Sequence, residues 1–154
     1  MEPSLLLTPR DLGLDPGLDE AGFNAVGVLS VCRYDELVAV PWRSAALLPG
    51  ATSAVVLGCG GPAFGEAFLR SPEAGLAEHP IDHFASRIVE AAAETLRRRG
   101  APTRAIYYWQ NRDGAFADFI ALARAVGLGL ASRVGILIHP SYGPWISLRA
   151  ALLT

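Results

Sequence analysis

The last stretch of the chain, GILIHPSYGPWISLRAALLT (residues 135–154), decides the fold. Residues 135–138 and 145–148 are short, apolar and bounded by turn residues, a pattern that predicts two buried strands. Between them, HPSYGP (residues 139–144) predicts a turn because it is rich in Pro, Gly and Ser. The chain ends in the apolar residues 150–154, which raises the question of what this tail packs against.

The segments before this stretch alternate between strand and helix patterns. Runs of β-branched and small apolar residues predict strands over residues 25–31, 53–58 and 105–109. A short helical piece near residues 34–38 is broken by Pro41. The alternation predicts an α/β (α+β) fold: a layered domain with a central mixed sheet of about five strands, flanked by helices and closed by the final two strands.

Two segments have the spacing of amphipathic helices. Residues 82–99 carry an apolar stripe, with Asp82 as a candidate N-cap and Gly100 just beyond the end. A second stripe over residues 116–123 is followed by the helix-ending Gly127. The basic triplet at residues 97–99 falls where the first helix ends. Positive charge is favourable there, so the triplet indicates a helix terminus rather than an RNA-binding patch.

Composition limits the class of protein. A chain of 154 residues with 51% apolar and 18% charged residues fits one globular domain, with residues 1–17 as an irregular lead, and excludes a disordered chain. No apolar run approaches the roughly 18 residues of a membrane span, and Glu2 stands where a signal peptide carries positive charge. We therefore expect a cytoplasmic protein without a membrane partner. The net charge of −2 argues against a nucleic-acid partner.

The cysteines and histidines do not form a familiar metal motif. Cys32 and Cys59 are expected to be buried thiols, and two cysteines cannot supply the four thiolates of a 4Fe-4S cluster. His79 and His83 are four residues apart, but Pro80 lies between them and no further ligand completes a zinc pattern. We therefore predict no metal site.

Several motifs carry a family resemblance. The run from Val126 through Gly127-Leu128-Gly129, then residues 136–145 (ILIHPSYGPW) and Leu152-Leu153-Thr154, resembles the amino-terminal, cobalamin-binding domain of the epoxyqueuosine reductase family and related 4Fe-4S ferredoxin-like proteins. The likeness spans most of residues 18–154. It implies a nitroreductase-like or cobalamin-reductase-like fold. In that family a cysteine-rich ferredoxin-type domain follows soon after the equivalent of Thr154, so iron–sulfur electrons are expected from outside these residues.

The resemblance implies a cobalamin pocket beside the last turn. A corrin ring needs an apolar cleft, aromatic walls and donors for its side-chain amides. The residues we predict to bind the cofactor are Tyr108, Gly129, His139, Pro140, Tyr142 and Trp145. For each aromatic residue taken singly, the alternative is that it fills the core. His139 replaces an Asn of the family and is expected to donate a hydrogen bond to a cofactor amide. Gly127 is equally explained as a helix C-cap.

A reductase also needs a proton donor. Counted back from the helix-ending glycine, Asp113 falls where epoxyqueuosine reductases keep an acid, so the resemblance implies Asp113 as the catalytic acid. The alternative is that Asp113 is the N-cap of the following helix. The family's Gly-Lys-Asn motif has Arg133 and Val134 in place of Lys and Asn.

Three hypotheses remain open from the sequence. The first is the cobalamin-binding domain of a reductase, with an iron–sulfur electron donor on a separate chain or in a domain beyond residue 154. The second is a non-catalytic corrinoid or flavin binding or processing module. The third is a ferredoxin-like fragment without its own chemistry, which acts by association and is a possible homodimer through its apolar tail.

Overall fold

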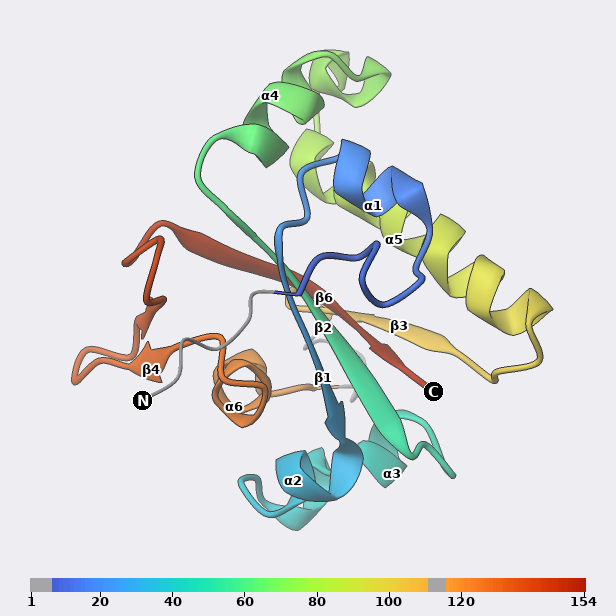
Figure 1. Cartoon of the computed structure of the whole chain (residues 1–154), viewed down its shortest axis with the longest axis vertical. Coiled ribbons are helices and arrows are strands. Elements are labelled where there is room, and N and C mark those ends of the chain that lie inside the picture. Colours follow the sequence, from blue (N-terminus) through green and yellow to red (C-terminus); the bar gives the residue numbers. More distant parts are fainter. Residues whose placement is uncertain (1–6, 111–115) are drawn as a thin grey trace.

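The structure is a computed structural model that describes residues 7–110 and 116–154. Its centre is a four-stranded sheet with the order β1-β2-β6-β3, in which every neighbouring pair is antiparallel. Helices lie on both sides of this sheet (Figure 1). The strands are β1 (Ala25–Ser30), β2 (Ser53–Gly60), β3 (Arg104–Tyr107) and β6 (Ile146–Leu153).

The apolar tail of the chain is the middle of the molecule. β6 pairs with β2 on one side and β3 on the other, and Ala150, Ala151, Leu152 and Leu153 are buried. The carbonyl of Thr154 accepts hydrogen bonds from the backbone N–H groups of Thr52 (2.7 Å) and Ser53 (3.1 Å). A strand buried on both faces reads as a continuous apolar run, which explains the sequence of this segment.

The sheet separates two hydrophobic cores. One core lies under α1 (Pro16–Glu20), α4 (Ala63–Leu69) and α5 (Pro80–Arg98) and includes Val55, Leu57 and Cys59 of β2. The other lies under α2 (Val31–Asp35), α3 (Ser44–Leu47) and α6 (Phe119–Ala125) and includes Ala54 and Val56. Successive residues of a strand point to opposite faces, so β2 supplies both cores by alternation. Two short 3-10 turns complete the connections, η1 (Val40–Trp42) and η2 (Pro72–Gly75).

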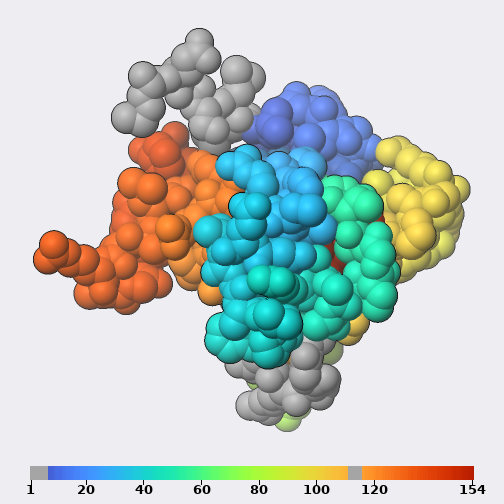
Figure 2. Space-filling view, turned by 90° about the horizontal axis from the view of Figure 1, so that it is seen from below, coloured from blue at the N-terminus to red at the C-terminus, as the bar shows by residue number. Residues whose placement is uncertain are grey.

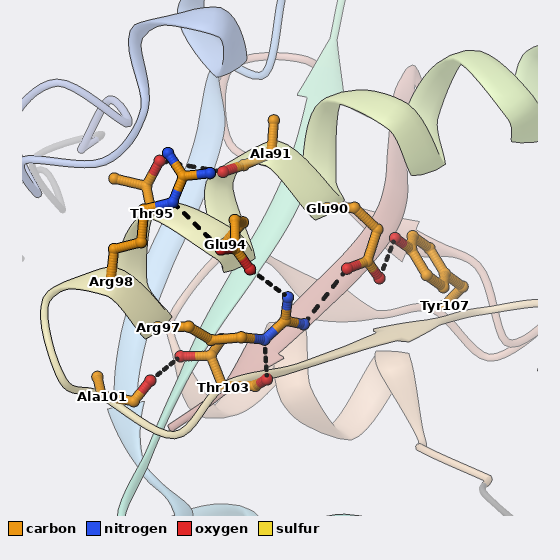
Figure 3. A network of polar contacts seen from close by, with 9 residues as sticks. All are labelled: Glu90, Ala91, Glu94, Thr95, Arg97, Arg98, Ala101, Thr103 and Tyr107. Atoms are coloured by element: carbon orange, nitrogen blue, oxygen red, sulfur yellow. Dashed lines mark hydrogen bonds and ion pairs between the residues drawn. The ribbon is translucent and has the colours of Figure 1, made fainter.

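The helix predicted over residues 82–99 is confirmed, with an earlier start. α5 begins at Pro80, whose fixed φ suits the first helical position, so Asp82 lies in the first turn and is not the N-cap. Figure 3 shows the end of the helix, where Arg97 contacts Glu90 and Glu94 and its Nε donates to the carbonyl of Thr103 at 2.9 Å. Arg98 pairs with Glu94. The basic triplet therefore closes the helix, as its position predicted.

The second amphipathic helix is confirmed as α6, which begins at Phe119. Its N-cap is Asp118, whose carboxylate accepts a hydrogen bond from the N–H of Ala121 at 2.9 Å. Asp118 and not Asp113 therefore caps this helix, so the capping alternative for Asp113 is wrong. Asp113 itself lies outside the described residues.

The layered α+β class is confirmed, but two details of the predicted sheet are wrong. The central sheet has four strands and is antiparallel, rather than mixed with about five. The strand predicted over residues 135–138 joins a separate two-stranded ribbon, in which β5 (Leu137–Ile138) pairs with β4 (Leu130–Ala131). An alternation of strands and helices does not specify strand direction. A connection long enough to contain a helix can join either parallel or antiparallel strands.

Two smaller observations complete the fold. Cys59 is buried as expected, whereas Cys32 is exposed, and both are free thiols. Across residues 7–110 and 116–154, none of the helices combines the length and the apolar character that a membrane span needs.

Candidate functional site

A pocket of about 450 Å³ opens where β2 ends and β6 begins, beneath α4 and the first turn of α5. This volume lies in the range of small-molecule sites. Most of the lining side chains are apolar, and the single charged one is Arg149. The lining residues are Cys59, Gly61, Phe64, Gly65, Phe68, Ile81, Pro144, Trp145, Ile146, Ser147 and Arg149.

A β-bulge places Arg149 in this pocket. Along the β2–β6 ladder Gly58 pairs with Leu148 but Leu57 pairs with Ala150, so Arg149 is an extra residue without a partner on β2. Without the bulge, a count back from Leu152 would put Arg149 on the face covered by α6. With it, Arg149 and Ala150 both lie on the face covered by α4 and α5. Bulges commonly re-aim a side chain beside a functional site.

The guanidinium of Arg149 is held by an aromatic ring. Its central carbon lies 4.9 Å from the centroid of the Phe64 ring, a cation–π distance. Its Nε is buried and has no hydrogen-bond partner among the described residues. The five ion pairs found within residues 7–110 and 116–154 do not include Arg149. Within the described residues, the pocket thus contains a cation with no carboxylate partner and with its Nε–H unused.

The charge of Arg149 acts on two neighbouring groups. Burial raises the pKa of the Cys59 thiol, and Arg149 opposes that shift. Burial and the nearby Asp82 carboxylate raise the pKa of Tyr108, while Arg149 again acts in the opposite direction. The hydroxyl of Tyr108 donates to Oδ1 of Asp82 at 3.2 Å. Both groups are therefore protonated near neutral pH and sit close to the cation.

Of the predicted cofactor residues, Trp145 lines this pocket, and Tyr108 lies near its cation, Arg149. Trp145 lines it and is 81% exposed, which leaves most of the indole available for a ligand. Tyr108 is 44% exposed and belongs to the neighbourhood of Asp82 and Arg149. Neither side chain is used to fill a core.

Tyr142 and His139 lie on the other side of the sheet. Tyr142 packs against the core under α6, and its ring occupies the space beside Gly60, where a Cβ would come well under 3.0 Å from it. The ring of His139 lies 4.9 Å from that of Tyr142 and is buried. The structure therefore separates Tyr142 from Trp145, although only two residues lie between them.

The turn between β5 and β6 is organised by the imidazole of His139. Nδ1 accepts hydrogen bonds from the backbone N–H groups of Ser141 (3.0 Å) and Tyr142 (3.2 Å). A nitrogen that accepts carries no proton, so the neutral ring holds its proton on Nε2. Nε2 is buried without a partner among the described residues, and burial lowers the pKa of His139. Any hydrogen bond from His139 to a cofactor amide would have to use Nε2.

The remaining predicted residues lie apart from the pocket. Gly129 lines a second cavity of about 340 Å³ between α2 and α6, and a Cβ at this position would collide with the carbonyl of Ile138. Close packing of the β4–β5 ribbon therefore requires glycine there. Pro140 is exposed in the turn. Asp113, the predicted acid, lies outside the described residues, and among the described ones there is no group of three metal-ligating side chains.

Sequence reasoning missed Cys59, Phe64 and Arg149. Arg149 carried a signal, because it is the single charged residue within the apolar run from Ile146 to Leu153. A lone charge in a strand that is buried on both faces needs a structural reason. The positions of Cys59 and Phe64 at the pocket depend on the packing of α4 over the end of β2, which no local pattern encodes.

Comparisons with known proteins show which solved structures share this fold. Searches with the sequence match no protein-family model and no curated protein. By structure, 12 solved chains are similar. The C. elegans B12-trafficking protein CblC, a homologue of human MMACHC, matches with a TM-score of 0.63 and 18% identity over 83% of this chain. Epoxyqueuosine reductase from Streptococcus thermophilus matches with a TM-score of 0.63 and 13% identity over 95% of this chain.

A reductive dehalogenase described as suggesting a mechanism for B12-dependent dehalogenation matches with a TM-score of 0.54 and 21% identity over the whole chain. The chain spans 62% of CblC, 46% of the S. thermophilus reductase and 21% of the dehalogenase. The resemblance to the epoxyqueuosine reductase domain is therefore confirmed at the level of the fold. Function does not follow from a fold alone.

Proposed function

We propose that this chain is the cobalamin-binding domain of a reductase that receives its electrons from an iron–sulfur donor. The proposal is supported by the structural neighbours, which include a B12-trafficking protein, epoxyqueuosine reductases and B12-dependent reductive dehalogenases. When bound, cobalamin would supply a reducible cobalt centre, a chemistry that the side chains of the protein lack.

The observation that carries the proposal is the open, apolar pocket bounded by Trp145. A corrin is a wide, flat ring whose rim carries amides, so its site needs an apolar wall and nearby donors. The indole of Trp145 supplies an exposed flat wall, and the phenol of Tyr108 lies near Arg149. The pocket of about 450 Å³ is open, so a bound cofactor would contact the residues that line it and the exposed surface around it.

Titration with hydroxocobalamin tests the proposal. We expect the visible spectrum of the cofactor to change on binding and the melting temperature of the protein to rise with cofactor concentration. Trp145→Ala should weaken binding without lowering the stability of the free protein, because the indole is mostly in solvent. Leu69→Ala is a matched control, since Leu69 is 73% exposed on α4 and does not line the pocket. An unchanged spectrum together with an unchanged melting temperature would exclude cobalamin.

The proposed role of Asp113 is to donate the proton that reduction requires. Asp113→Asn should abolish reduction with a strong chemical reductant and leave cobalamin affinity intact. Asp118→Asn is the matched control, because Asp118 caps α6 and asparagine caps a helix about as well, so this change should leave both stability and turnover intact. Full turnover by Asp113→Asn would remove Asp113 from the mechanism. Cobalamin binding without turnover by the wild-type protein would instead indicate a module that carries or processes the cofactor.

A further inference from the structure

The pocket beside β6 combines an apolar wall with one cation that the described residues leave unpaired. Phe64, Phe68 and Trp145 give it aromatic sides, and Arg149 provides its charge. Such a combination suits a ligand that has an apolar body and a negatively charged end. A neutral amide of the same shape would offer the guanidinium one uncharged carbonyl acceptor, and hydrogen bonds between a charged pair are stronger.

We propose that Arg149 is the anchor of a subsite for small organic carboxylates with an aromatic or other apolar body. The inference goes beyond the proposed function, because it concerns the protein without cobalamin and would hold for a chain that binds no corrin.

Three structural features favour a specific site over a chance surface charge. The bulge at Arg149 interrupts the regular pairing of a central strand by one residue, and it brings the Arg149 side chain to the pocket. The ring of Phe64 lies against the guanidinium and restricts it. The Nε atom is shielded from water, which shows that this side of the guanidinium is poorly solvated, and a charged hydrogen bond from its outer N–H groups is strong in such an environment.

A carboxylate fits the guanidinium better than a single point acceptor. The N–H groups of arginine lie in one plane and match two carboxylate oxygens at once. The guanidinium carbon lies over the ring of Phe64 at 4.9 Å from its centroid, and a phenyl ring offers no conventional acceptor that would occupy the N–H groups. Near the cation, the hydroxyl of Tyr108 donates its one proton to Asp82 at 3.2 Å, so the N–H groups of Arg149 remain the donors for the ligand.

The apolar lining restricts the body of the ligand. Ile81, Pro144 and Ile146 complete the walls between the three aromatic rings. The cavity of about 450 Å³ accommodates a molecule of the size of a substituted benzoate or a short fatty acid, and excludes a nucleotide with its several charges because only one cation lines the walls.

The test compares benzoate with benzamide, which has the same shape and no charge. Both are titrated into cofactor-free protein by calorimetry, while the Nε–H signal of Arg149 is followed by ¹⁵N NMR. We expect benzoate to bind about tenfold more tightly than benzamide and to shift the Arg149 signal, because a hydrogen bond to a charged group contributes more than one between neutral groups.

Three variants of the pocket connect this preference to its cause. Arg149→Gln should reduce the affinity ratio of benzoate to benzamide to about one, and Arg149→Lys should leave an intermediate ratio because lysine keeps the charge and loses the planar fork. Arg43→Gln is the matched control, since Arg43 is exposed beside α3 and should leave the ratio unchanged. Trp145→Ala should weaken both ligands equally, and it tests the apolar wall even where Arg149→Gln does not fold.

Two results would overturn the inference. One is equal binding of benzoate and benzamide to the wild-type protein, or a preference that survives in Arg149→Gln. The other is tighter binding of inorganic phosphate than of benzoate, which would mark a phosphoryl site instead. Neither result bears on the cobalamin titration, which measures a different ligand, so the two proposals fail separately.

Discussion

The contact between Gly60 and Tyr142 gives a sharp test of how the last turn packs. Gly60 ends β2, and the side-chain amide of Asn24 bonds to both of its backbone groups, at 2.7 Å to its N–H and 2.9 Å to its carbonyl. Gly60 does not have a positive φ, so its backbone would accept an alanine. What excludes a side chain is the ring of Tyr142, which occupies the place of the Cβ.

We therefore predict that Gly60→Ala destabilises the protein through Tyr142 alone. Overpacking of this kind costs about 1–3 kcal/mol. For a chain of this length that corresponds to a fall in melting temperature of roughly 2–12 °C. In a Tyr142→Ala background the ring is gone, so the same Gly60→Ala change should be neutral or stabilising by about 0.5–1 kcal/mol. The coupling energy between the two sites should then be about 1–4 kcal/mol.

Urea unfolding of the wild type, both single variants and the double variant measures this coupling. Gly65→Ala is the control, because a Cβ at that position meets no atom within 4 Å and Gly65 lies within helix α4. It should be neutral or stabilising. If Gly60→Ala costs the same in both backgrounds, Tyr142 does not pack against β2, and the turn would again be available as the wall of a ligand site.

Three further predictions concern stability. Leu152→Ala should cost about 2–5 kcal/mol because Leu152 is fully buried in the central strand, whereas Leu130→Ala, at a side chain 77% exposed, should cost less than about 0.5 kcal/mol in the same urea titration. The hydrogen bond from Arg87 lowers the pKa of Glu73 from 4.5 to about 2, so this pair stabilises the fold above pH 4.5 and the contribution is lost as the pH falls toward 2. Glu73→Gln should flatten the stability profile in that window by less than about 1 kcal/mol, and an unchanged profile would show that the pair contributes nothing. Burial lowers the pKa of His139 below 6.5, so the unfolded chain takes up a proton first as the pH falls below 6.5, and stability should decline there. In the folded protein, ¹⁵N NMR should show the Nε2–H tautomer of His139. A proton on Nδ1 would contradict the turn geometry.

Local patterns predicted most of the regular elements. The stripe of α5 and the β-branched run of β2 were readable because each buries one face or both, and burial leaves a period in the sequence. The start of α5 is less readable, because the sequence predicts a capping side chain at Asp82 whereas the helix begins at Pro80. The partner of residues 137–138 was not readable, because strand pairing depends on which distant segment is nearest.

Tertiary structure decides which of the predicted aromatic residues lie at the pocket. Trp145 and Tyr142 have similar side chains in one turn, yet Trp145 lines the pocket and Tyr142 fills the opposite core. The chain turns between them, where the backbone N–H of Trp145 donates to the carbonyl of Tyr142 at 3.0 Å. Composition identifies aromatic residues near a turn, but the side of the sheet on which each one lies is set by backbone geometry.

From the sequence alone came the apolar character of the C-terminal strand, the two amphipathic helices and the likeness to a cobalamin-binding domain. Only the tertiary structure decided that this last strand lies between β2 and β3, that its pairs are antiparallel, and that a bulge brings Arg149 to a pocket. The physical reason is that periodicity records how deeply a segment is buried, whereas strand order and a one-residue bulge result from contacts between segments far apart in the chain.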